Sequence, residues 1–142
     1  MKMKSLTFMK TYTPKSDYLL LFRNNAWYQD LSPEEIQRVM TEWMAWFDSL
    51  VADGRCLGGQ SLEQDGRVVL GASRQVTDGP YAEAKESVAG YFMLRVADLD
   101  EATEIAKLCP GLPYGATVEV RKLMERCGAS QMAEKPELAD VL

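Results

Sequence analysis

Residues 17–36 read DYLLLFRNNAWYQDLSPEEI, and this stretch decides how the chain begins to fold. The continuous apolar run at residues 18–22 is bounded by polar residues, which is typical of a strand covered on at least one face. Ser32 and Glu35 have the spacing of a capping box, and Pro33 suits the first position of a helix. The stretch therefore predicts a buried strand, a short loop and a helix.

Apolar residues then recur at steps of three and four, so we expect this helix to bury one stripe and to end near Gly54. Trp46 lies on or beside the stripe, and we interpret it as a packing residue. The expected stripe comprises Ile36, Val39, Met40, Trp43, Met44, Phe47, Leu50 and Val51.

Further strands are predicted downstream of the helix. Residues 55–62 and 67–76 are predicted to form a hairpin across Asp65-Gly66, a dipeptide that favours tight turns. The Gly58-Gly59 pair indicates a bulge or a close backbone approach in the first of these strands. Residues 88–96 and 117–123 predict two more strands.

A second helix is expected to begin after Asp98, a good N-cap, and to stop at Pro110-Gly111. Its predicted buried stripe comprises Leu99, Ala102, Ile105, Ala106 and Cys109.

The predicted order of elements gives an α+β fold. Without the added hairpin the order is βαββαβ, the ferredoxin-like plan, which places both helices on one face of an antiparallel sheet. The strands are too apolar for the other face to be left in water, so we expect a second copy to cover it as a homodimer. We divide the chain into an N-terminal extension (1–16), the domain (17–124) and a C-terminal tail or short outer helix (125–142).

Composition narrows the classes of function. A net charge of −5 over 142 residues argues against nucleic acid and anionic membrane surfaces as partners, and we find no apolar run long enough to span a membrane. The three cysteines are widely spaced and the chain has no histidine, so we expect no disulfide framework, no metal site and no cofactor. Reduced thiols indicate a cytoplasmic location.

The most unusual segment, residues 76–86, combines carboxylates, a lysine and a tyrosine between two predicted strands. One interpretation is a site in which Asp78 acts as the catalytic acid or base, because clustered charges can shift its pKa. The other is that Asp78-Gly79-Pro80 simply builds a turn and the charges after it are a solvated surface. If the segment is a site, the candidate ligand-binding residues are Arg74, Tyr81, Glu83, Lys85 and Glu86.

Residues 78–86 read DGPYAEAKE, and residues 89–92 read AGYF. Together with 31–35 (LSPEE), 98–102 (DLDEA) and 118–121 (VEVR), they resemble the DGPF-type group of the YCII-related family, with Tyr81 in place of the usual Phe. The resemblance implies a dimeric α+β barrel built from ferredoxin-like subunits. A related branch includes a dehydrochlorinase of chlorinated hydroxyquinols with a proposed histidine and aspartate, of which only Asp78 could correspond here.

Two hypotheses for function stay open. The first is a small-molecule site in a cleft between sheet and helix, with or without acid/base chemistry. The second is a non-catalytic dimeric adaptor or regulatory module that binds another protein. Trp27 and Tyr28 could stack a planar ligand or cap the edge of the core. Arg74, Arg95 and Arg121 could hold an anion, although sheet-face arginines more often pair with neighbouring carboxylates.

Overall fold

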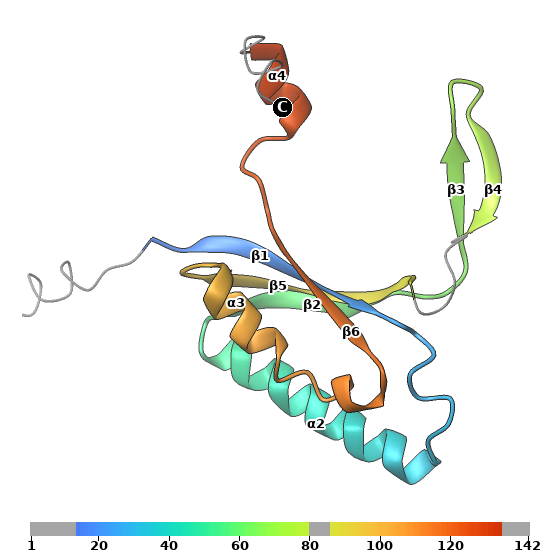
Figure 1. Ribbon diagram of the computed structural model, residues 1–142, viewed down its shortest axis with the longest axis vertical. Helices are drawn as coiled ribbons and strands as arrows, with labels where there is room; N and C mark the ends of the chain where they lie inside the picture. Colours follow the sequence, from blue (N-terminus) through green and yellow to red (C-terminus); the bar gives the residue numbers. More distant parts are fainter. Residues whose placement is uncertain (1–13, 80–85, 135–142) are drawn as a thin grey trace, which may run out of the picture.

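The computed structural model describes residues 14–79 and 86–134 (Figure 1). Their elements, in chain order, are β1 (Ser16–Arg23), α2 (Pro33–Ala52), β2 (Cys56–Ser61), β3 (Gly66–Leu70), β4 (Gln75–Gly79), β5 (Val88–Val96), α3 (Leu99–Ala106), a short 3-10 helix (Leu112–Tyr114), β6 (Thr117–Lys122) and α4 (Gly128–Glu134).

Four strands form one antiparallel sheet in the order β2-β5-β1-β6, and α2 and α3 both lie on one face of it (Figure 1). This is the strand order of the βαββαβ plan, so the α+β class is confirmed. The separate pair β3-β4 is inserted between the second and third strands of that plan. The predicted strands at 18–22, 88–96 and 117–123 correspond to β1, β5 and β6.

The core lies between the sheet and the two helices. Along β1, Tyr18, Leu20 and Phe22 are buried while the residues between them are only partly buried, as the two-residue period of a strand requires. Leu19 and Leu21 therefore point to the opposite face, where they lie across from Met93 and Tyr91 of β5. Among the described residues, no helix covers this second face (Figure 1).

The predicted start of α2 is confirmed in detail. Ser32 Oγ accepts a hydrogen bond from the Glu35 amide at 3.2 Å, and Glu35 Oε1 accepts one from the Ser32 amide at 3.3 Å. Pro33 is the first helical residue, where a missing N–H leaves nothing unpaired. The helix ends at Ala52, and Gly54 follows in the left-handed region with φ 75°.

The buried stripes are narrower than the sequence predicts. In α2 the buried side chains are Val39, Trp46 and Leu50, with Trp43 and Phe47 packed against the core. The prediction that four further residues belong to the buried stripes is wrong. A helix on a sheet buries only the side chains on the arc that faces the strands, and the apolar pattern of the sequence predicts a wider arc. The exposed ones are Met40, Met44, Val51 and Leu99.

The predicted hairpin is wrong. β2 pairs with β5, and β3 pairs with β4 across a turn at residues 71–74. Gly71 and Arg74 both have positive φ, at 70° and 58°, so the chain reverses there and not at residues 65–66. Gly66 is instead the first residue of β3.

The interpretation of residues 78–80 as a turn is also wrong for its first two residues, which end β4. Asp78 lies across from Arg67, where a cross-strand pair of opposite charge fits a strand. Pro80 lies outside the described residues.

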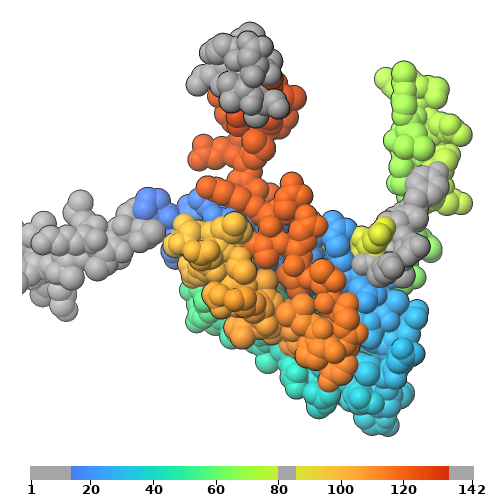
Figure 2. Space-filling model, viewed as in Figure 1, coloured from blue at the N-terminus to red at the C-terminus, as the bar shows by residue number. Residues whose placement is uncertain are grey.

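The β3-β4 hairpin projects from the body of the molecule, on the side of the sheet that the helices leave open (Figure 1). The segment from the end of β6 to α4 rises on the same side, at a distance from the hairpin along the sheet (Figure 2). The second face therefore lies between two projecting segments.

Candidate functional site

A cleft of about 520 Å³ opens between α2, the loop at residues 24–31 and the ends of β2 and β5. This volume lies within the range of small-molecule sites. Most of its lining is aromatic or aliphatic, and a few polar side chains converge on it. The lining residues are Phe22, Arg23, Asn25, Trp27, Tyr28, Ile36, Met40, Trp43, Met44, Phe47, Gly59, Gln60, Ser61, Leu62, Gln64, Ala89, Gly90, Tyr91 and Phe92.

Aromatic rings make up much of the lining of the cleft. Phe22 and Phe92 meet edge to face, with ring centroids 4.7 Å apart and an interplanar angle of 78°. Trp27 stacks on Trp43 with centroids 5.9 Å apart and an angle of 19°. Such surfaces favour flat, apolar ligands, since stacking gains about 0.5–1.5 kcal/mol per ring pair beyond buried area.

The position of Trp43 depends on a glycine. A Cβ added to Gly111 would lie 2.7 Å from Trp43 Cζ3, closer than real Cβ contacts. The indole therefore lies directly against the backbone that follows α3. α3 ends at Ala106, so the predicted stop at Pro110-Gly111 is wrong, and Gly111 instead makes room for Trp43.

Asn24 fixes the loop that carries Asn25 and Trp27. Asn24 has φ 66°, a left-handed conformation that asparagine tolerates better than most residues. Its Nδ2 donates to the Gly115 carbonyl oxygen at 2.7 Å, and its Oδ1 accepts from the Ala26 amide at 3.3 Å. The loop is thus tied to the chain just before β6.

Asn25 is one of the polar residues that line the cleft. Its Oδ1 is buried and has no hydrogen-bond partner among the described residues. Gln60, Ser61 and Gln64 are further polar residues of the lining. The described lining contains no carboxylate, lysine or cysteine, and Arg23 is its one side chain with a permanent charge.

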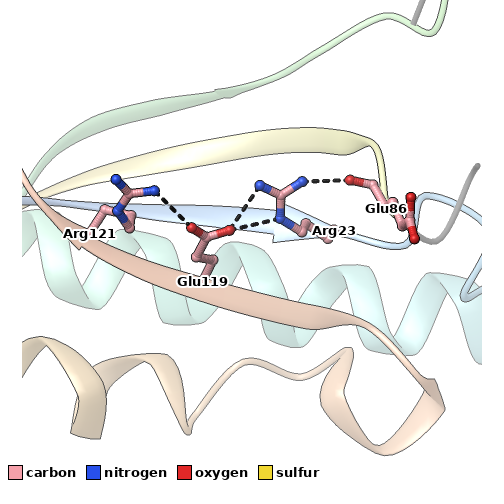
Figure 3. Close-up of polar contacts among 4 residues, drawn as sticks. All are labelled: Arg23, Glu86, Glu119 and Arg121. Atoms are coloured by element: carbon pink, nitrogen blue, oxygen red, sulfur yellow. Dashed lines mark hydrogen bonds and ion pairs between the residues drawn. The ribbon is translucent and has the colours of Figure 1, made fainter. Parts of the chain in front are cut away.

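Arg23 links the cleft to the open face of the sheet (Figure 3). Its Nε donates to Glu119 Oε1 at 2.9 Å, and its Nη1 donates to the backbone oxygen of Glu86. Arg121 Nη1 donates to Glu119 Oε2 at 3.1 Å. The hydrogen bonds from Arg23 and then Arg121 lower the pKa of Glu119.

Of the predicted site residues, Arg74, Asp78 and Glu86 are among the described residues, and none of the three lines this cleft. Asp78 and Arg74 are exposed on the hairpin, on β4 and in its turn. Glu86 is exposed and uses its backbone oxygen to hold Arg23. Tyr81, Glu83 and Lys85 lie outside the described residues. The catalytic and ligand-binding roles of all six stay predictions.

Of the other candidates, Trp27 and Tyr28 do line the cleft. The ion-pair interpretation is confirmed for Arg95, which donates to Asp17 through Nε at 2.8 Å, and for Arg121. Asn25 was missed as a site residue. Its only signal was its place after an apolar strand, which is equally typical of an ordinary turn.

The three cysteines are free, as predicted. Cys56 and Cys109 are buried, and burial raises the pKa of the Cys109 thiol to about 11. Within residues 14–79 and 86–134, no group of three or more potential ligands is placed to hold a metal ion. Over the same residues, no helix has the length and apolarity that crossing a bilayer requires.

The family of YCII-related domains matches residues 12–125, which is most of the chain. The chain therefore belongs to the YCII-related domain family. It is also similar to an uncharacterized protein, R00369, from Rhizobium meliloti (strain 1021), with 43% identity over 49 residues. That alignment spans 34% of this chain and 40% of the relative.

Proposed function

We propose that this chain is a homodimeric binding protein whose aromatic cleft takes a small, flat, largely apolar ligand. The observation that carries the proposal is the cleft itself, about 520 Å³ of space lined by rings from β1, α2, β5 and the loop at 24–31. Pockets of this size, mostly apolar with few convergent polar groups, are the usual form of small-molecule sites.

The proposal is for binding without a catalytic step. The described lining offers no carboxylate, lysine or cysteine that could carry a proton or attack a substrate. Asp78 is exposed on the hairpin and is not part of the lining. An Asp78→Asn variant is therefore expected to bind cleft ligands as the wild type does. Loss of binding would instead support the acid/base role predicted for Asp78.

The cleft is tested by a thermal-shift screen of flat aromatic compounds against the wild type. Compounds that stabilise the wild type are then measured with a variant whose cleft is filled by a larger side chain, and with a matched control variant. Met44 lines the cleft and is 51% exposed, while Leu99 lies on α3, outside the lining, and is 52% exposed. Met44→Trp should abolish the stabilisation given by the hits, and Leu99→Trp should preserve it. Hits that stabilise both variants equally, or no hits at all, would contradict the proposal.

We further propose that a second copy packs on the open face of the sheet to give the dimeric α+β barrel. Leu19 and Met93 lie side by side at the centre of that face. A stable interface should bury more than about 1,000 Å² in total. Light scattering at micromolar concentration should give a dimer, which Leu19→Lys should dissociate. Leu108→Lys, at an exposed position after α3, is the matched control. A monomeric wild type would refute the dimer.

The sequence motif at residues 78–80 supports assignment to the DGPF-type group, and the free thiols support a cytoplasmic location.

The adaptor alternative rests on one observation, the exposed apolar side chains of the hairpin, Val69, Leu70 and Val76. Single exposed apolar residues are ordinary, but a cluster on a projecting hairpin is typical of protein contacts. Val69→Ser with Val76→Ser should disrupt that function and leave ligand binding by the cleft unchanged.

A further inference from the structure

The β3-β4 hairpin exposes apolar side chains that the described part of the chain leaves uncovered. Val69 and Val76 lie directly across from each other, and they are 63% and 55% exposed. Arg67 and Asp78 form the next pair on the same face, so a pair of opposite charge borders the apolar one. Within the described residues, β3 and β4 pair only with each other. A two-stranded hairpin by itself is only marginally stable in water, so this one needs a surface to pack against.

The position of the hairpin indicates what that surface is. The hairpin projects on the side of the sheet that the helices leave open, where Leu19 and Met93 lie side by side on the sheet face (Figure 1). A second copy that packs on this face would lie beside the hairpin, so one partner would cover both apolar surfaces. A different protein bound to the hairpin alone would leave the sheet face in water.

The size of the open face supports the same partner. With four strands about 4.8 Å apart and the eight residues of β1 rising about 3.3 Å each, the face measures about 500 Å² per copy, or about 1,000 Å² for two. Ion pairs of Asp17 with Arg95 and of Arg23 with Glu119 occupy its two ends, so its apolar centre is smaller. Stable interfaces bury about 1,600 Å² in total. The face alone is therefore a small interface, and further contacts are needed.

We propose that the β3-β4 hairpin is a dimerisation arm, which reaches past the open face and packs its Val69–Val76 pair on the body of a second copy. This inference rests on the proposed homodimer and adds where the remaining contact lies. Because a two-fold interface is self-complementary, each copy both gives an arm and receives one. The hairpin and the open face, which are separate apolar surfaces in one copy, are then parts of a single interface.

The first test measures the dissociation constant of the dimer by sedimentation equilibrium. Val69→Ser combined with Val76→Ser should raise that constant by at least about tenfold, since apolar contact is lost at both arms. The matched control is Leu99→Ser combined with Leu108→Ser, which removes two side chains of similar exposure, 52% and 65%, on and just after α3, and should leave the constant unchanged. A hairpin variant that dimerises as tightly as the wild type would overturn the arm and leave the dimer. A monomeric wild type would refute both.

The second test needs no change in the hairpin. Amide hydrogen exchange of residues 66–70 and 75–79 is compared between the wild-type dimer and the Leu19→Lys variant. The hairpin amides should exchange more slowly in the dimer, because contact with the second copy opposes local opening of a marginal hairpin. If Leu19→Lys does not fold, wild-type protein diluted below its dissociation constant provides the monomer. Equal exchange in dimer and monomer would overturn the arm and favour the adaptor alternative for the hairpin.

Discussion

Replacing Phe92 with alanine tests whether the aromatic cluster beneath the cleft holds the domain together. Phe92 is only 7% exposed and contacts three other rings. Its centroid lies 4.7 Å from Phe22, 4.9 Å from Phe47 and 5.0 Å from Trp46. These rings come from β1 and α2, so Phe92 joins the sheet to the helix.

The expected loss of stability is large. A Phe→Ala change in a packed core costs about 3–5 kcal/mol, and each ring pair adds about 0.5–1.5 kcal/mol beyond buried area. The cleft above Phe92 already provides space into which neighbours can relax, so we expect a value near the middle of the core range, about 4 kcal/mol. Domains of this size are stable by only about 5–15 kcal/mol. Phe92→Ala should therefore lower the melting temperature by roughly 13 °C.

The assay is urea unfolding followed by circular dichroism, at one fixed protein concentration because dimerisation adds to apparent stability. Tyr28→Ala is the control, since Tyr28 is 38% exposed and meets Trp27 edge to face with centroids 5.5 Å apart. It should lose less than about 1 kcal/mol. If Phe92→Ala lowers the free energy of unfolding by no more than Tyr28→Ala does, the view that this cluster is the main contact between sheet and helix is refuted.

Three other predictions concern local chemistry. Ser32→Ala removes the capping box of α2 and should cost about 1 kcal/mol in urea unfolding, while Ser32→Gly should cost only a few tenths. Because the folded pKa of Glu119 is lowered, its stabilising effect is present above its usual pKa and is lost as the pH falls through the lowered value. The difference in urea midpoint between wild type and Glu119→Gln should therefore shrink on acidification below about pH 4.5, and a constant difference would be evidence against the pairing. In the native protein, Cys127 should react first with a thiol reagent, because it is exposed and backbone hydrogen bonds from Ser130 and Ala129 lower its pKa. Cys109 is buried and its pKa is raised, so it should react only after unfolding.

The sequence predicts those parts of the fold that local patterns determine. The capping box at Ser32 and the continuous apolar run at residues 18–22 are such patterns, and the structure begins α2 at the first and forms β1 at the second. The pairing of strands is different, because a strand at residues 55–62 can pair with either of two later strands. An Asp-Gly turn favours the nearer one, but β2 pairs with β5, whose apolar residues complete the core. Long-range burial outweighed the local turn signal.

The candidate site was harder to predict than the fold, for a related reason. The segment at 76–86 stands out because its charged residues are neighbours in sequence. The cleft instead combines side chains from β1, the loop at 24–31, α2, β2 and β5, most of them ordinary core residues when considered singly. Asn25 becomes notable only when its oxygen is found buried and unpaired, and no sequence pattern conveys that.

The Gly58-Gly59 pair shows how a backbone signal in the sequence can report on a site. The predicted bulge is confirmed, with a register shift between Cys56 and Gly58, and Gly58 has φ 147°. A Cβ on Gly59 would lie 2.4 Å from the Tyr91 carbonyl oxygen and 2.7 Å from Phe92 Cδ1. Any side chain there would have to displace the strand or the ring beneath the cleft. The glycines thus let β2 pair closely with β5 while leaving the edge of the sheet open. Gly59 itself lines the cleft, so the same close approach that completes the sheet also shapes the space for a ligand.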